Sequence, residues 1–468
     1  MFKSTRSAML AALVFTPPAL VMAAQPVASQ TLQEALAMAY ANNPTLQAAR
    51  AQLRAVDENV PQALAGWRPT VQLQGSAGQQ VSSTNSNDRV AAPWRSRDPV
   101  SASASVTQPL YRGGRTTATI RQAENQVLAQ RARLLATEQQ ILLDTVNAYV
   151  AVIRDQEEVR LNVNNEQVLM RQLQATNERF RVGEITRTDV AQAESRLAGS
   201  RSSRADAEGR LQTSRATFQR LVGQPPQRLS PPQPLRPPVT NAQEAAQAAS
   251  QNNPNVVAAL FDEAAARERI DVQFSQLLPQ AGLTAQLFRN DNQTGGLTDD
   301  TRTQGNSVTA NLTVPIYQGG AEYAAVRQAR QQAQQARQQI DEQRRRTGAD
   351  ATQAWETLAA ARAQVESVRA QIRAAEIALD GVQREAIVGS RTTLDVLNAE
   401  QELLNARVSL VRALANVVNA SHSLVASIGR LTARDLALPV PLYDMEAYYR
   451  EVRNRWIGLG DYSEAGRR

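Results

Sequence analysis

The stretch "RVGEITRTDVAQAE" (181–194) returns as "IVGSRTTLDVLNAE" (387–400), and this repeated corner decides the fold of the chain. Each copy interrupts a long helical pattern at Val-Gly and restarts it near Asp-Val. A glycine after the last helical turn can adopt the left-handed backbone that ends helices, and Thr or Asp side chains cap the next helix. We therefore expect two helical hairpins. The corner residues are expected to be Gly183 followed by Thr188 or Asp189, and Gly389 followed by Thr392 or Thr393.

The rest of the chain carries the same duplication. "LQEALAMAYANNP" (32–44) matches "AQEAAQAASQNNP" (242–254), and "PLYRGG" (109–114) matches "PIYQGG" (315–320). The prolines and glycines that interrupt helices recur in the same order in both halves. This indicates an internal repeat rather than chance similarity between helical sequences. Proline favours the first turn of a helix, so each Asn-Asn-Pro is expected to separate a short helix from a second one.

The repeats set the expected domain boundaries. Residues 24–222 form the first repeat and 241–429 the second, with a proline-rich connector at 223–240 and a tail at 430–468. Residues 1–23 have the charged start and the short apolar stretch of a secretory signal. The mature protein is therefore expected to be exported.

Each repeat contains two segments in which apolar and polar residues alternate, as they do in β-strands. We expect strands at about 70–80, 99–110, 281–289 and 307–317. Their length suits strands that cross a membrane, although a soluble amphipathic sheet would share the pattern. Four strands cannot close a membrane barrel, so several copies of the chain must combine, in a number that the sequence does not fix.

Very long helices are expected after the strand pairs. Apolar residues recur every seven positions along these helices and their return helices, which is coiled-coil patterning. A helix over 115–178 would extend roughly 96 Å, well beyond its return helix over 188–222. The helix at 44–64 is therefore expected to stack end to end on the return helix. The strand-helix junctions are expected at Gly113, Gly114, Gly319 and Gly320.

Composition excludes several classes of protein. The chain has no cysteine, one histidine and 4% aromatic residues. It contains no HExxH, nucleophile elbow or P-loop, so we expect no enzymatic activity, no cofactor and no metal site. The formal charge of +7 comes from arginines that alternate with polar and acidic residues along helices, so no nucleic-acid partner is expected. His422 is expected to serve packing.

The duplicated plan, the Asn-Asn-Pro motifs, the "YxGG" junctions and the two Val-Gly corners together resemble the TolC-type outer membrane channel family. The tail "LYDMEAYYREVRNRWIG" (442–458) is similar to the ending of type I secretion members. The resemblance implies a mainly α fold with a small β part. Three copies would share a twelve-stranded barrel in the outer membrane, above an α-helical tunnel in the periplasm, with the connector and the tail as an equatorial belt.

The resemblance also implies partners and a function. The homotrimer would export substrates in type I protein secretion or multidrug efflux. It would contact outer membrane lipid, a periplasmic membrane-fusion adaptor and an inner-membrane ABC or RND transporter. The alternative is a periplasmic coiled-coil adaptor or scaffold without a membrane barrel. Adaptors usually have one hairpin between other domains, whereas this chain interleaves two hairpins with strand pairs.

The corners carry the functional residues that the resemblance implies. They would form the periplasmic tip, where Arg391 meets Asp189 of the neighbouring corner and holds a gate closed, with Thr188 as a further gate residue. Asp395 would belong to an inward acidic ring, and a ring of like charges in a narrow pore selects cations. The adaptor-docking residues would be Val182, Gly183, Val388 and Gly389.

Overall fold

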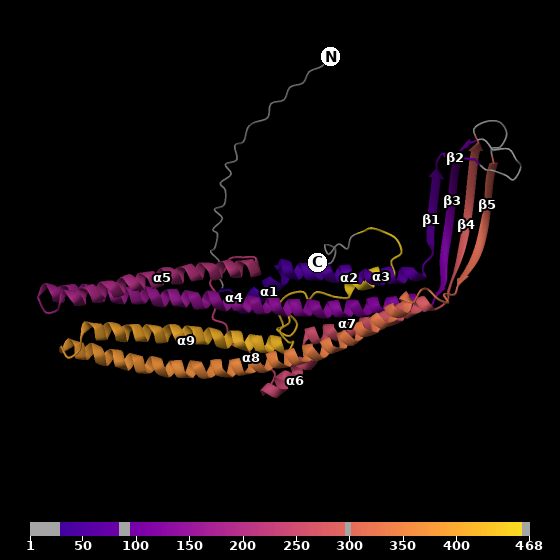
Figure 1. Cartoon of the computed structure of the whole chain (residues 1–468). Coiled ribbons are helices and arrows are strands. Elements are labelled where there is room, and N and C mark those ends of the chain that lie inside the picture. The colour runs from indigo at the N-terminus through magenta and orange to yellow at the C-terminus, as the bar shows by residue number, and fades with distance from the viewer. Residues whose placement is uncertain (1–28, 84–93, 295–300, 461–468) are drawn as a thin grey trace, which may run out of the picture.

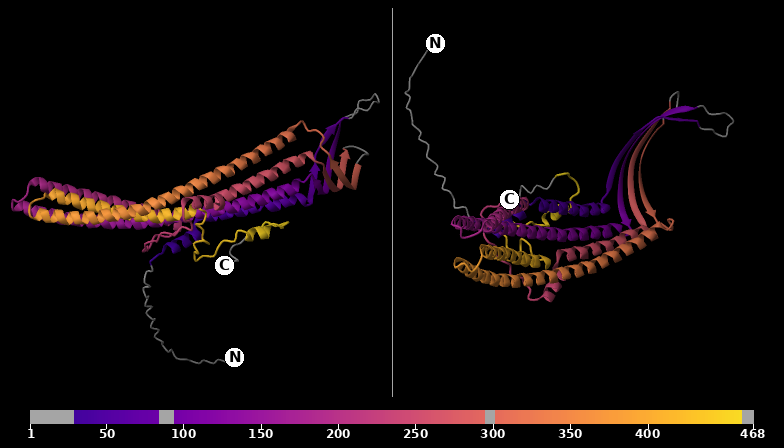
Figure 2. Two further views of the ribbon diagram at one scale, coloured as in Figure 1. Left: turned by 90° about the horizontal axis from the view of Figure 1, so that it is seen from below. Right: turned by 60° about the vertical axis from the view of Figure 1, so that its left-hand side comes forward.

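The computed structural model describes residues 29–83, 94–294 and 301–460, so the predicted signal at 1–23 lies outside the described residues. The molecule is elongated, with a β-sheet at one end and two helical corners at the other (Figures 1 and 2). Two helices of 67 residues, α4 (Arg115–Arg181) and α8 (Ala321–Ile387), run along most of it. A helix of this length extends about 100 Å.

The return helices cover only part of these long helices. α5 (Arg187–Val222) and α9 (Thr393–Ser427) have 36 and 35 residues. Each is continued by helices from the start of its own repeat, and two short helices lie beside the joints. These helices are α1 (Leu32–Asn42), α2 (Pro44–Asp57) and α3 (Asn59–Leu64) in the first repeat, and α6 (Ala242–Asn252) and α7 (Pro254–Phe274) in the second.

The expected single helix over 44–64 is wrong in one respect, because it is divided at Glu58 into α2 and α3. The cause is Pro61, which has no N–H to donate to the carbonyl four residues earlier. The 3₁₀ turns Ala65–Trp67 and Ser275–Leu277 then lead from α3 and α7 toward the strands.

One asparagine forms each end-to-end joint, which confirms the predicted stacking. The side-chain oxygen of Asn253 accepts a hydrogen bond from the Asn255 N–H (2.9 Å) at the start of α7, and its side-chain nitrogen donates to the Ser427 carbonyl (2.9 Å) at the end of α9. Asn43 does the same between α2 and α5, donating to the Leu221 carbonyl at 3.1 Å. One side chain thus satisfies backbone groups of two helix ends at once.

The sheet is antiparallel in the order β1-β3-β4-β5. Its strands are β1 (Thr70–Ala77), β3 (Arg95–Arg112), β4 (Gln280–Thr294) and β5 (Thr301–Thr313), and the short β2 (Gln80–Ser82) also pairs with β3. Strands from the two repeats therefore form one sheet, joined by the β3–β4 pair.

The register of the sheet separates two faces. One row across the four strands reads Val71, Val106, Ala285 and Val308, and the adjacent row reads Gln72, Ser105, Gln286 and Ser307. The apolar face is uncovered in a single chain, because Val71 is 75% and Val308 72% exposed. An exposed apolar sheet face of this extent marks a surface that another molecule or a membrane covers.

The predicted strand ranges need correction. The second and third, expected at 99–110 and 281–289, are longer and occupy 95–112 and 280–294. The fourth strand was expected at 307–317 but occupies 301–313, because Pro315 has no N–H for the ladder and the chain turns toward α8. The first was expected at 70–80 but stops at Ala77, and residues 80–82 pair separately as β2. Within the described residues, no helix combines the length and the hydropathy needed to cross a membrane.

The connector and the tail pack against the middle of the molecule. Leu431 and Leu438 of the tail are buried in the largest apolar cluster, with side chains of α1, α2, α4 and α9. Farther along, α10 (Ala447–Val452) lies on α2, where the Tyr448 hydroxyl donates to Glu58 at 2.6 Å. Nearby, burial raises the pKa of Asp57 to about 7 despite the charge of Arg131.

We predict that Asn253→Ala lowers the stability of the second hairpin by about 1–2 kcal/mol, since it removes the cap of α7 and leaves the Ser427 carbonyl without its partner. The apparent melting temperature of the detergent-solubilised protein would measure this loss. Asn252→Ala is the matched control, because the exposed Asn252 precedes it in the same motif and makes no described side-chain hydrogen bond. Equal melting temperatures for the two variants would contradict the double-cap role.

Candidate functional site

The two corners lie at the same end of the molecule, opposite the sheet (Figure 1). In the first, α4 ends at Arg181 and is followed by Val182 and then Gly183, whose φ of 79° is left-handed. The Gly183 N–H donates to the Phe180 carbonyl and the Glu184 N–H to the Arg179 carbonyl, which closes the last turn. Gly389 has the same φ of 79° in the second corner, as expected. Both glycines therefore end long helices, as the sequence predicted.

The predicted cap of α5 is wrong. Thr186, not Thr188 or Asp189, is the N-cap residue, and its hydroxyl accepts from the Asp189 N–H at 3.4 Å. The Asp189 carboxylate in turn accepts from the Thr186 N–H at 3.0 Å. This reciprocal arrangement is a capping box, and the signal that identifies it is a Thr three residues before an acid.

The second corner is capped in the same way, and here the prediction of Thr392 is confirmed. The Thr392 hydroxyl accepts from the Asp395 N–H at 3.2 Å, and the Asp395 carboxylate accepts from the Thr392 N–H at 3.0 Å. These hydrogen bonds lower the pKa of Asp395, which keeps the carboxylate charged. Thr393 is the first residue of α9 rather than its cap.

The corners differ in the order of their charges. In the first, Arg179 stands before the glycine and pairs with Glu184 after it, at 2.5 Å. In the second, Glu385 stands before the glycine and pairs with Arg391 after it, at 2.8 Å. The polarity is therefore reversed between two corners of the same backbone shape. The hydrogen bond from Arg391 to Glu385 also raises the pKa of the guanidinium.

The expected partners Arg391 and Asp189 are not paired within one chain. Arg391 contacts Glu385, a residue that the sequence interpretation missed, and Asp189 is occupied by its capping box. The Thr188 side chain makes no described hydrogen bond, and it is exposed. An Arg391–Asp189 contact would therefore have to form between copies of the chain.

The Val-Gly pairs present apolar side chains outward. Val182 and Val388 are each 78% exposed at the ends of the hairpins. A Cβ on Gly183 or Gly389 would meet no other atom, so the requirement for glycine there is the positive φ alone. The two corners therefore each present one exposed valine side chain at the end of a hairpin.

The strand-helix junctions use their glycines differently. Gly114 and Gly320 are the N-cap residues of α4 and α8, with φ of 80° and 87°. Gly113 has φ of 60°, and a Cβ there would lie 2.6 Å from the Ser275 carbonyl oxygen, whereas Gly319 has open space around it. The first junction is thus packed closely against the end of α7 and the second is not.

Contacts between the hairpins lie nearer the middle of the molecule. Glu158 of α4 is buried and accepts two hydrogen bonds from Arg412 of α9, at 2.7 and 3.1 Å, with Arg210 of α5 at 3.3 Å. Burial alone would raise the pKa of Glu158, but the hydrogen bond and charge of Arg412, together with Arg210, lower it. Glu158 therefore stays charged and joins the two hairpins.

A smaller apolar contact joins them toward the corners. Leu397 of α9 is 2% exposed and packs with Leu169 and Leu197 of the first hairpin. Beside it, Arg196 donates to the Asn398 side-chain oxygen at 2.7 Å.

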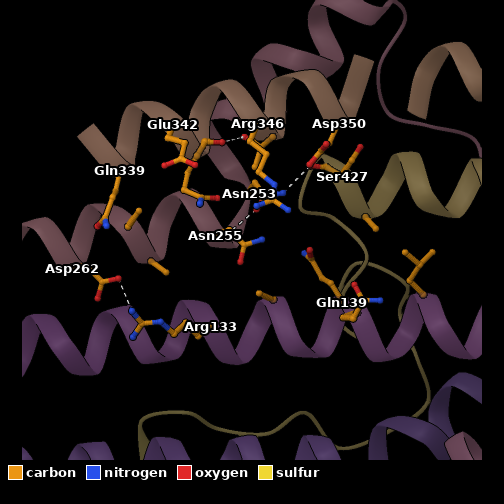
Figure 3. Close-up of a pocket in the computed structure, with 18 of the residues that line it drawn as sticks. Arg133, Gln139, Asn253, Asn255, Asp262, Gln339, Glu342, Arg346, Asp350 and Ser427 are labelled. Carbon is orange, nitrogen blue, oxygen red and sulfur yellow. Dashed lines mark hydrogen bonds and ion pairs between the residues drawn. The ribbon is translucent and has the colours of Figure 1, made fainter. Parts of the chain in front are cut away.

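A polar recess of about 670 Å³ lies between α4, α7, α8 and the end of α9 (Figure 3). Arg133 and Asp262 form an ion pair across it at 2.5 Å, and Gln339, Glu342 and Arg346 face it from α8. The buried Gln139 side-chain nitrogen has no partner among the described residues. A recess of this polarity suits water rather than an apolar ligand.

The remaining chemistry is structural. His422 is buried on α9, and its Nδ1 lies 2.8 Å from the Val418 carbonyl, so it packs inside the helix layer. In the described part of the chain, no three acidic or histidine side chains gather as a metal site would require.

Comparison with known proteins identifies the family. Residues 35–224 and 245–430 match the model of outer membrane efflux proteins, one match in each repeat. The chain is 35% identical over 462 residues to the outer membrane efflux protein BepC of Brucella suis biovar 1, which covers 98% of both chains. It is 26% identical over 396 residues to outer membrane protein TolC of Vibrio cholerae, covering 83% of this chain and 88% of TolC.

The fold agrees with solved structures. The outer membrane protein VceC of Vibrio cholerae matches with a TM-score of 0.70 at 21% identity, over 85% of this chain and 96% of VceC. These matches confirm the predicted TolC-type resemblance, the outer membrane location and the export function at the level of the family. They do not favour a free periplasmic adaptor. The chain belongs to the outer membrane efflux protein family, which is a family of transport channels rather than enzymes.

Proposed function

We propose that three copies of this chain form a continuous export channel, with a shared twelve-stranded barrel in the outer membrane and a helical tunnel in the periplasm. The single observation that carries the proposal is the sheet. Its four long strands have one apolar and one polar face, and both faces are exposed in one chain. A membrane barrel requires this alternation, with lipid outside and water inside.

The edges of the sheet support assembly between copies. β1 and β5 are the outer strands, and within the described residues neither has a partner on its outer edge. Unpaired backbone groups are costly in lipid, so β1 of one copy would pair with β5 of the next until the sheet closes. The connector and the tail would then form a belt around the middle of the tunnel.

The corners would form the gate at the far end of the tunnel. Three copies would place six corners around one opening, alternating between the two polarities. Arg391 of one corner would then lie near Asp189 or Glu184 of the corner from the next copy, where opposite charges attract. Asp395 would face the opening as an acidic ring, and Val182 and Val388 would contact the periplasmic adaptor.

Opening would move the second hairpin away from the first. Glu158–Arg412 and the Leu397 contact would act as the inner limit of that movement, because they hold α9 against α4 and α5 nearer the middle. At the corners beyond them, Val182 and Val388 are exposed. The energy and the cargo, protein or drug, would come from an inner-membrane ABC or RND transporter.

Native mass spectrometry in detergent tests the assembly. We expect a trimer, because a single chain leaves both edges and the apolar face of its sheet uncovered. A stable monomer that remains folded in detergent would contradict the shared barrel.

Arg391→Ser is expected to raise the fraction of time that the channel spends open in planar bilayers. An exposed ion pair contributes about 0–1 kcal/mol, so the open-to-closed ratio should rise by up to roughly fivefold. Arg384→Ser is the matched control, since Arg384 is an exposed arginine of α8 that pairs with Asp380 on its own helix. If the two variants conduct alike, Arg391 has no special role in the gate.

Glu158→Gln is expected to loosen the second hairpin by about 1–3 kcal/mol, since Arg412 and Arg210 lose a charged acceptor. Hydrogen exchange along α9 would show the change as faster exchange around residue 412. Glu157→Gln is the control, because Glu157 is the adjacent residue and forms only an exposed pair with Arg160. Unchanged protection of α9 in Glu158→Gln would show that apolar packing alone joins the hairpins.

A further inference from the structure

The last described residues, 453–460, are held where the helices meet the sheet. Ala447 and Val452 of α10 are buried, and Tyr448 binds Glu58 of the α2–α3 joint. Just after α10, Arg453 donates to Glu124 of α4 at 3.1 Å. The segment therefore starts from a docked helix rather than from a free chain.

Arg68 fixes the position of the segment. Its guanidinium donates to the Arg455 carbonyl at 2.7 Å and lies 4.8 Å from the centre of the Trp456 ring. Arg68 stands two residues before Thr70, the first residue of β1. The stacking places Trp456 beside the end of the sheet that joins the helices.

The segment exposes apolar side chains at this level. Trp456 is 66%, Ile457 90% and Leu459 fully exposed. Gly458, with φ of 122°, separates Ile457 from Leu459, and Gly460 follows Leu459. Arg68 stacks on one side of Trp456, whereas Ile457 and Leu459 are almost uncovered by the described residues.

The other exposed tryptophans mark the two ends of the sheet. Trp67 stands before β1 at the helix end and is 42% exposed, whereas Trp94 stands before β3 at the opposite end and is 75% exposed. Trp355, the fourth tryptophan, is partly buried among helices. Tryptophan is enriched where membrane proteins cross the boundary between lipid and water. Trp456 lies at the same end of the sheet as Trp67.

We propose that residues 453–460 are a membrane-contacting segment that inserts Trp456, Ile457 and Leu459 into the inner leaflet of the outer membrane, beside the first strand. Arg68 acts as the positioning residue, and Arg68 and Arg455 would contact the lipid phosphates. Position favours lipid over a protein partner, because Arg68 ties the segment to the start of β1, where the apolar side chains of Val71 and Leu73 are exposed. The inference rests on the proposed placement of the sheet in the membrane.

Single-cysteine labelling of the full chain tests the inference, since the native sequence contains no cysteine. Leu459→Cys, Leu73→Cys and Ser202→Cys would each carry an environment-sensitive fluorophore in vesicles of phosphatidylethanolamine and phosphatidylglycerol. Nitroxide lipids labelled near the headgroup would serve as quenchers. Leu73 lies on the apolar face of β1, and Ser202 is exposed on α5, far from the sheet.

We expect quenching at 459 to be at least about twofold stronger than at 202 and close to that at 73. Quenching at 73 without quenching at 459 would overturn the inference and leave the proposed channel intact. In that case, a label at 459 that is shielded from water in detergent as well would show that a neighbouring copy, instead of lipid, covers the segment. Absence of quenching at 73 would overturn the membrane placement of the sheet, and this inference with it.

Discussion

Each 67-residue helix must bury an apolar side over its whole length, and the helix that returns from its corner covers only about half of it. The rest of the architecture depends on this mismatch. The helices α2 and α7 complete the layer, and Asn43 and Asn253 satisfy the backbone at the two joints. The Asn-Asn-Pro motif thus allows one helix to continue another end to end without leaving backbone carbonyls unpaired at the joint.

Such a layer has two different ends, and its chemistry is divided between them. At one end the two repeats merge into a single sheet through β3 and β4, so neither repeat forms the membrane part alone. At the other end the repeats stay apart as two corners of the same backbone shape. Glu158 and Leu397 hold the hairpins together between these ends. These contacts hold the hairpins together, and the movement proposed for the gate would take place beyond them.

The two corners share one backbone shape but differ in their charged residues. Both have the left-handed glycine and the Thr-Asp capping box. These shared features are what the backbone needs to end one helix and begin the next. The charges are reversed, with Arg179 and Glu184 in one and Glu385 and Arg391 in the other.

The sequence by itself determined the internal repeat, because the same motifs occur twice in the same order. It also determined the features that depend on near neighbours: the glycine corners, the alternation of the strands and the proline-started helices. These local signals act over two to seven residues, so they can be read along the chain. The Thr186 cap could have been predicted in the same way, from its spacing to Asp189. Glu385 could not have been predicted as the partner of Arg391, because the geometry of the turn decides which side chains meet. Only the tertiary structure decided that Glu158 meets Arg412, that Asn253 reaches Ser427 and that Arg68 holds Trp456. Those contacts join residues far apart in the chain, and they follow from how long helices pack in register over many turns.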